Sequence, residues 1–198
     1  MHLIPIITAM LVMSACAAKP TTVNKSFVYE NFLGEGRPEF RATTQNLELR
    51  NSPVSESSIS QVAPISDSKA LPFDKVVTKT IEAGNIKVSG DVFVKTRSFG
   101  EIEKLTAEAY YDESIAWEDR TINADDKPTL LMWLSEGNCL IKIKQTVDEI
   151  SDCPTESAGL WVLLNQPKTE TWIEARINES KGWVKVDGQQ VKEVSRNF

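Results

Sequence analysis

The stretch that decides the fold is "TWIEARINESKGWVKVDGQQVKEV", residues 171–194. Apolar residues alternate with polar ones in "WIEARI" and again in "WVKV", which is the period of a strand with one buried face. The segments "NESKG" and "VDGQ" follow the two runs, and each supplies residues that adopt positive φ at low cost. The stretch therefore predicts a β-hairpin and a further turn.

Similar runs recur along the chain at a spacing of roughly ten residues, as in an all-β protein. Each is short, alternating and rich in Val, Ile, Thr or aromatic residues: "TTQNLELR", "GDVFVKT", "KLTAEAYY", "TLLMWL", "CLIKIKQ" and "GLWVLL". No window has the period of an amphipathic helix, and no segment repeats another. We expect small all-β barrels or a sandwich, with a core that includes Trp133, Trp161, Trp172 and Trp183.

Two segments resemble the bacterial SH3-like family. Residues 46–62, "NLELRNSPVSESSISQV", are similar to its opening: an alternating strand with Leu47 and Leu49 inward, then Arg50 and a turn. Residues 171–194 are similar to its closing half, and the matching positions are Trp172, Ile173, Gly182, Trp183 and Val184. The resemblance implies one or two small SH3-like barrels.

Two domain arrangements are open, because the chain between these segments is longer than one such barrel needs. In the first, two barrels stand in tandem at residues 41–122 and 123–198, with the polar run "WEDRTINADDKP" at the boundary. In the second, one barrel is split by an insertion. Residues 16–40 are mixed and unperiodic, and we expect them to form a linker with little fixed structure.

The N-terminal residues have the pattern of a secretory signal, expected to span residues 1–15. Residues 3–18 are apolar apart from Thr8 and Ser14, a run too short for a transmembrane helix. Ser14 and Ala15 directly before Cys16 resemble a bacterial lipoprotein signal, which implies a lipid on Cys16. Since Ala17 follows rather than aspartate, the resemblance implies the periplasmic side of the outer membrane. The same residues also fit an ordinary cleavage site, which would release a soluble protein.

The other two cysteines, Cys139 and Cys153, are expected to form a disulfide in an exported chain. Cys16 is then left over for the lipid. Closing this loop stabilises the fold by about 3 kcal/mol in the chain-entropy model. The alternative is a redox pair, but thirteen residues separate the cysteines, unlike the two residues of a redox motif. A structural bond is the favoured interpretation.

Composition excludes several functions. The chain is 41% hydrophobic and 25% charged, as in ordinary globular domains, and its formal net charge of −6 without a basic cluster excludes nucleic acid as a partner. The single histidine, His2, lies in the signal, so the mature chain lacks histidine-based catalysis and nearly every catalytic zinc site. We therefore expect no enzyme, metal or cofactor. A hydrolase built on carboxylates alone is the remaining enzymatic alternative.

Acidic residues are concentrated at residues 108–126, where seven acids accompany one arginine and account for the whole net charge. Tyrosine and tryptophan are interleaved with them, so carboxylates and cation–π contacts could attract a basic or amine-bearing ligand. A calcium site is a second interpretation, although the spacing of a calcium-binding hand is missing. The third is a solvated edge with its aromatic residues inward. The candidate binding residues are Tyr110, Tyr111, Asp112, Glu113, Trp117, Glu118 and Asp119.

These observations predict a non-enzymatic lipoprotein of the cell envelope, tethered to the membrane through Cys16, whose SH3-like body binds a protein, a peptide or the cell wall. The family resemblance favours wall peptide. A structural or assembly accessory of another envelope protein is the alternative, followed by the carboxylate hydrolase.

Overall fold

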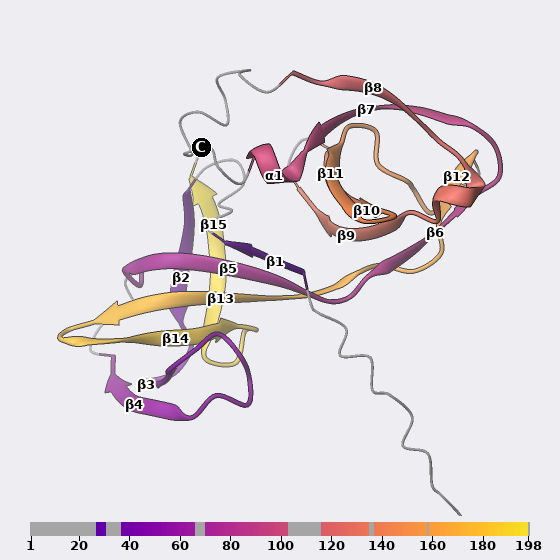
Figure 1. Cartoon of the computed structure of the whole chain (residues 1–198). Helices are drawn as coiled ribbons and strands as arrows, with labels where there is room; N and C mark the ends of the chain where they lie inside the picture. The colour runs from indigo at the N-terminus through magenta and orange to yellow at the C-terminus, as the bar shows by residue number, and fades with distance from the viewer. Residues whose placement is uncertain are drawn as a thin grey trace, which may run out of the picture.

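The part of the chain that the structure describes is almost entirely β-structure, as the alternating pattern predicts. A computed structural model describes residues 27–30, 37–65, 70–102, 116–134, 137–157 and 159–197. Two curled, largely antiparallel sheets make up these residues (Figure 1). Between the strands lie the single-turn helix α1 (Phe99–Ile102) and the 3₁₀ helix η1 (Ala124–Asp126). No helix in the described ranges has the length and hydrophobicity needed to span a membrane.

The first sheet has eight strands in the order β1-β5-β13-β14-β15-β2, and β3 joins it by pairing with β14 and β4. Its ladders are antiparallel except for the single parallel pair Val186↔Val191. The strands are β1 (Phe27–Glu30), β2 (Arg37–Ala42), β3 (Asn46–Arg50), β4 (Ile59–Pro64), β5 (Phe73–Glu82), β13 (Lys168–Ile177), β14 (Ser180–Val186) and β15 (Val191–Asn197).

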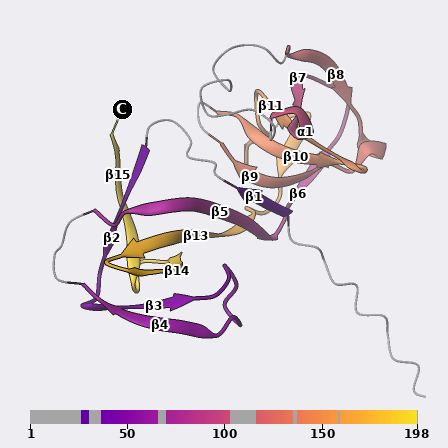
Figure 2. The ribbon, with the colours of Figure 1, turned by 60° about the vertical axis from the view of Figure 1, so that its left-hand side comes forward.

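The second sheet has seven strands in the order β12-β6-β9-β10-β11-β7-β8. Figure 2 shows it curled beside the first sheet. The strands are β6 (Gly84–Val88), β7 (Val92–Ser98), β8 (Glu118–Ile122), β9 (Thr129–Trp133), β10 (Cys139–Ile143), β11 (Thr146–Ile150) and β12 (Trp161–Leu163).

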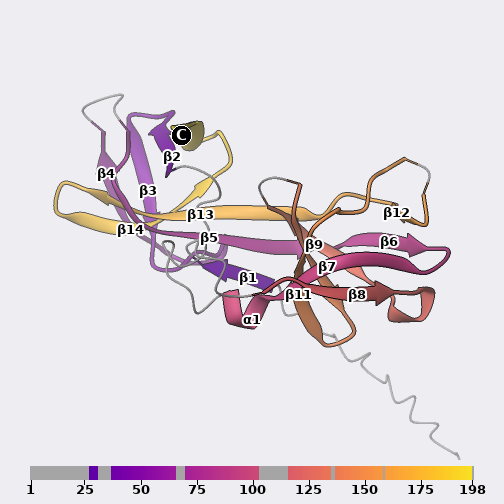
Figure 3. The same ribbon diagram turned by 90° about the horizontal axis from the view of Figure 1, so that it is seen from above.

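The chain passes between the two sheets twice. Strands of the first sheet come from residues 27–82 and 168–197, whereas those of the second come from residues 84–163. In Figure 3, β5 leads into β6 while β12 leads back into β13 alongside it. The boundary expected after residue 122 falls between β8 and η1, within the second sheet. Each range of the tandem arrangement, 41–122 and 123–198, contributes strands to both sheets.

The two crossing segments are held together at Gly84 and Asn165. A Cβ atom on Gly84 would lie 2.6 Å from the carbonyl oxygen of Asn165, so only glycine allows this approach. The backbone nitrogen and Nδ2 of Asn85 donate to Oδ1 of Asn165 at 3.1 and 2.7 Å. The nitrogen of Leu164 donates to the oxygen of Asn85 at 2.8 Å. Close packing and hydrogen bonds therefore join the crossings.

The predicted hairpin at residues 171–194 is confirmed: β13 and β14 pair from Thr171↔Val186 to Ile177↔Ser180. It packs against the other segment singled out by the sequence, because Leu47 and Leu49 are fully buried in the same core as Ile173. Burial of each such side chain stabilises the fold by about 1.5–3 kcal/mol. The two segments that resemble the SH3-like family thus lie in one body.

Two short strands arise in the range expected to be a linker. β1 pairs with β5, and β2 pairs with β15. Tyr29 and Phe40 are buried, and the ring of Tyr29 meets Phe99 edge-on with centroids 4.8 Å apart. The sequence predicted little fixed structure up to residue 40, and β1 and β2 differ from that prediction. Isolated aromatic residues form too short a pattern to indicate a strand. Their burial depends on strands distant in sequence.

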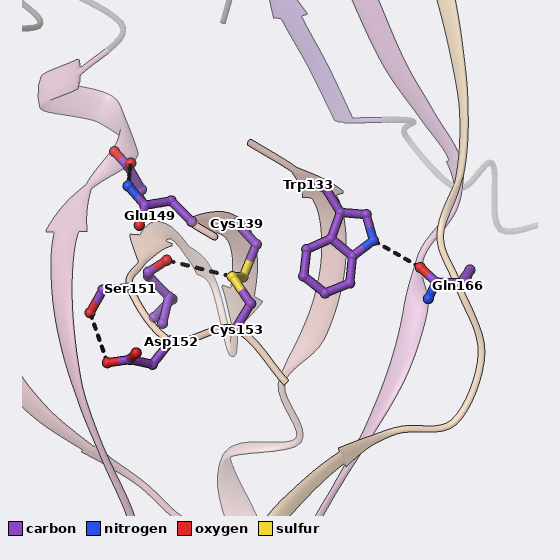
Figure 4. The surroundings of a disulfide bond; sticks show 9 residues. Trp133, Cys139, Glu149, Ser151, Asp152, Cys153 and Gln166 are labelled. Atoms are coloured by element: carbon purple, nitrogen blue, oxygen red, sulfur yellow. Dashed lines mark hydrogen bonds between the residues drawn. A yellow bond between two sulfur atoms is a disulfide. The ribbon is translucent and has the colours of Figure 1, made fainter. Parts of the chain in front are cut away.

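The predicted disulfide is confirmed and lies in the second sheet (Figure 4). Cys139 begins β10, faces Ile150 across the β10–β11 hairpin and is completely buried. Cys153 follows the hairpin and packs against the same core. The bond therefore joins the start of β10 to the segment that leaves β11.

Candidate binding groove

A groove with a volume of about 220 Å³ lies where the two sheets meet. Strands β2, β5, β13 and β15 of the first sheet contribute to it, together with β9 of the second. Buried Phe40 and Val76, which belong to the core of the first sheet, form its apolar floor. The groove is therefore built on packed residues of regular strands.

Threonine side chains form a polar strip along the groove. Thr78 and Thr171 face each other across the β5–β13 ladder, and their Oγ1 atoms lie 3.3 Å apart. Thr169 lies two positions earlier on the same face of β13. Hydroxyl groups both donate and accept hydrogen bonds, so this strip suits a ligand with peptide groups.

Trp133 is the aromatic side chain at the end of β9, where it lines the groove and remains 41% exposed. Its Nε1 atom donates a hydrogen bond to Oε1 of Gln166 at 2.8 Å (Figure 4). Nε2 of Gln166 in turn donates to Oε1 of Glu156 at 2.8 Å. This chain of bonds sets the orientation of the ring before any ligand arrives.

The junction that carries Trp133 is itself well packed. Tyr29, Phe99, Leu131, Met132 and Leu140 form a buried cluster that combines residues of both sheets. Oγ1 of Thr80 on β5 donates to the carbonyl oxygen of Leu131 on β9 at 2.9 Å. The two walls of the groove are therefore connected by apolar packing and a buried hydrogen bond.

Charge enters the groove through Glu193 on β15. An apolar floor, an aromatic ring, hydroxyl groups and a carboxylate can recognise a peptide segment that carries an amine. The volume is smaller than the roughly 300–1,000 Å³ of sites for drug-sized ligands. In the described ranges, no three His, Cys, Asp or Glu side chains are grouped so that they could hold a metal ion.

The acidic candidates do not contribute to this groove where the structure describes them. Tyr110, Tyr111, Asp112 and Glu113 lie outside the described residues, as does Cys16. Of the others, Trp117 is half-buried, and the Cζ atom of Arg97 lies 4.5 Å from the centroid of its ring. This aromatic side chain covers a cation of its own chain.

The remaining acids of the run lie on and after β8, on the second sheet. Glu118 and Asp119 are exposed, and Asp119 forms an ion pair of 2.8 Å with Lys95. Asp126 is buried beside Lys144 at 2.7 Å. The hydrogen bond from Lys144 and a second from the backbone of Asn123 lower the pKa of Asp126 below its usual 3.8. Part of the acidic run therefore serves local structure.

A buried ion pair lies under Trp117. Nη2 and Nε of Arg97 donate to Oε2 of Glu149 at 2.7 and 3.1 Å, and Nδ2 of Asn138 donates to Oε1 at 2.8 Å. Arg97 is 8% exposed and Glu149 is completely buried. This network connects β7, β11 and the turn before β10, away from the groove.

Sequence reasoning did not find the groove residues. Trp172 is buried as expected, but Trp133 is exposed, which corrects the prediction that it packs in the core. Three consecutive buried residues, 130–132, precede Trp133 and break the alternation. In the sequence, the three consecutive apolar residues at 130–132 were the one signal that Trp133 departs from the simple alternation of buried and exposed positions. The pairing of Thr78 with Thr171 had none, because 93 positions separate them.

Comparison with protein-family models, with curated proteins and with solved structures finds no significant match. The all-β fold and the groove at the junction of its two sheets are therefore the basis for assigning a function. The likeness of residues 46–62 and 171–194 to SH3-like domains stays a prediction.

Proposed function

We propose that this protein is a non-enzymatic binding module of the bacterial cell envelope and that the groove between its sheets holds a peptide. The orientation of Trp133 is the observation that carries the proposal. A large aromatic side chain left exposed loses hydrophobic stabilisation, and Gln166 nevertheless fixes it at the groove. Exposed, pre-oriented aromatic residues beside a depression are typical anchors of protein interfaces.

The chemistry of the groove favours a peptide with an amine group. Its volume accommodates one or two side chains, while the strip of Thr78, Thr169 and Thr171 can bond to a peptide backbone. The net charge of −6 favours a positive group. Wall peptides that carry a free amine meet these requirements, and the resemblance to SH3-like domains points to the same class.

The cellular location belongs to the same proposal. Lipidation of Cys16 would hold the body on the periplasmic side of the outer membrane, within reach of the cell wall. A disulfide between Cys139 and Cys153 suits this oxidising compartment. The tether then serves to concentrate the groove at the wall.

Calorimetric titration with soluble wall fragments that carry the peptide tests the groove. Removal of a tryptophan anchor costs about 2 kcal/mol or more, so Trp133→Ala should weaken binding roughly 30-fold. Phe93→Ala is the matched control, because Phe93 is 80% exposed on β7 and does not line the groove. Its affinity should remain within about twofold of the wild type.

Two results would contradict the proposal. One is wild-type protein that binds none of the fragments. The other is equal loss of affinity in Trp133→Ala and Phe93→Ala. If the wild-type protein binds no wall fragment but recovers a protein partner from envelope extracts, that result would support an assembly role instead.

A further inference from the structure

A second pocket, of about 310 Å³, lies in the other sheet between β6 and the segment from η1 to the start of β9. The ladder between β6 and β9 consists of Gly84↔Leu130 and Asn85↔Thr129. Beyond Asn85, β6 continues to pair with β12 as far as Val88. The ladder between β6 and β9 therefore ends at Asn85, and the pocket lies between the rest of β6 and residues 124–129.

Lysine supplies the charge of this pocket. Lys87 on β6 and Lys127 after η1 line it, and no Asp or Glu does. Neither lysine forms an ion pair within the described residues, whereas Lys95, Lys144 and Lys168 each lie against a carboxylate. In a chain with a net charge of −6, these two exposed lysines place positive charge beside one pocket.

The backbone holds Lys127 in a constrained position. Its φ of 46° and ψ of 56° are left-handed, a conformation that few residues other than glycine adopt. Reciprocal hydrogen bonds between Asn123 and residues 125 and 126 fix the 3₁₀ turn before it, and Pro128 follows directly. Its placement beside the pocket is thus set by the fold.

The remaining lining combines two chemistries. Pro128 is apolar and Thr129 adds a hydroxyl group, while Ile86 and Val88 alternate with Lys87 along β6 and pack against the core of the second sheet. A ligand with several anionic oxygens can take two ammonium groups and the hydroxyl together, and lysine is a common point-charge partner of phosphate. We propose that this pocket binds a phosphate-bearing anion, supplied either as a phospholipid headgroup or as free phosphate.

NMR titration of the mature protein, purified from cells, tests whether this pocket binds the anion. The sample is kept in neutral detergent, which accommodates any acyl chain on Cys16. The probes are inorganic phosphate, short-chain phosphatidylglycerol and, as the net-neutral lipid, short-chain phosphatidylcholine. Amide shifts at residues 85–88 and 127–129 are expected with phosphate or phosphatidylglycerol. Stronger binding of phosphatidylglycerol identifies the headgroup as the ligand, and equal binding identifies the phosphate group alone.

Charge-matched variants show whether the two lysines carry the binding. A lysine near an anionic surface contributes about a factor of five, so Lys87→Gln with Lys127→Gln should weaken binding roughly 30-fold. Lys75→Gln with Lys192→Gln removes the same charge from exposed positions on the first sheet and should change it less than twofold. Each single pocket variant should show an intermediate loss, which provides a second measurement if the double variant misfolds.

The proposal is overturned if neither anion shifts these amides. It is also overturned if phosphatidylcholine binds as well as phosphatidylglycerol, or if the control pair loses as much affinity as the pocket pair.

Discussion

Trp133 lies directly opposite Cys139 in the β9–β10 ladder, so the exposed ring of the groove and a buried sulfur of the disulfide occupy neighbouring positions (Figure 4). The covalent bond holds the start of β10, and β10 in turn pairs with the end of β9. The disulfide that stabilises the second sheet therefore also supports Trp133, the side chain proposed to contact the ligand.

Removal of the disulfide should affect both stability and the groove. We expect Cys139→Ala with Cys153→Ala to lose about 3 kcal/mol of unfolding free energy, measured by urea denaturation. Binding of wall fragments should weaken as well, because the β9–β10 pairing beside Trp133 is less constrained. Reduction of the wild type provides a comparison without a change of sequence. Unchanged stability in both samples would show that the bond has no structural role.

The buried pair Arg97–Glu149 should be intolerant of losing one partner. Glu149→Ala leaves the guanidinium group buried without its carboxylate, at an expected cost of about 3–5 kcal/mol in unfolding free energy. Arg97→Met combined with Glu149→Leu should recover most of this loss, since both charges are then absent. A double variant as unstable as the single one would mean that other contacts of these side chains dominate.

Gly84→Ala should destabilise the crossing between the sheets. The new methyl group would meet the carbonyl oxygen of Asn165 at 2.6 Å, so the backbone must shift, at a cost of about 1–3 kcal/mol. Gly159→Ala is the control, because its nearest contact would be an ordinary 3.7 Å. Thermal unfolding of both variants measures the difference. Equal melting temperatures would contradict the close approach.

The contribution of Asp126 should depend on pH. Its pKa in the folded protein is lowered, first by the hydrogen bond from Lys144, so the charged form stabilises the fold above its ordinary pKa of 3.8. This stabilisation is lost as the pH falls through the lowered folded value. Asp126→Asn should therefore be less stable than the wild type at pH 6, and the difference should shrink below about pH 3.8.

Unfolding measured across this pH range checks the prediction. The neighbouring exposed residue supplies the control as Asp125→Asn, which removes a carboxylate from the same turn and leaves the ion pair between Asp126 and Lys144 in place. A stability difference for Asp126→Asn that stays constant from pH 6 to pH 2 would contradict the linkage.

Cys16→Ala should change the location of the protein. If Cys16 carries lipid, the wild type fractionates with membranes and incorporates labelled fatty acid, and the variant incorporates none. The substitution leaves Ala15 and Ala17, on which an ordinary cleavage site depends, in place. Wild type and variant found equally in the soluble periplasmic fraction would exclude the lipid anchor while leaving the β-body unaffected.

Local pattern was enough for part of the structure. The alternation in residues 171–194 predicted the β13–β14 hairpin, because strand period and turn residues act over a few positions. The pairing of Cys139 with Cys153 followed from two observations: the chain has only three cysteines, and it is expected to be exported to an oxidising compartment. The acidic run was visible too, but its salt bridges to Lys95 and Lys144 depend on strand pairing that composition does not encode.

By itself, the sequence determined the all-β class, the hairpin near its C-terminal end and the disulfide. Tertiary structure alone decided that strands from residues 27–82 and 168–197 form one sheet, while the residues between them in sequence form the other. It also decided that Trp133 is exposed where the sheets meet. The physical reason is the range of the interactions. Side-chain alternation reports which face of a strand is buried, whereas the pairing of β5 with β13, and the groove it builds, depends on packing between residues about ninety positions apart.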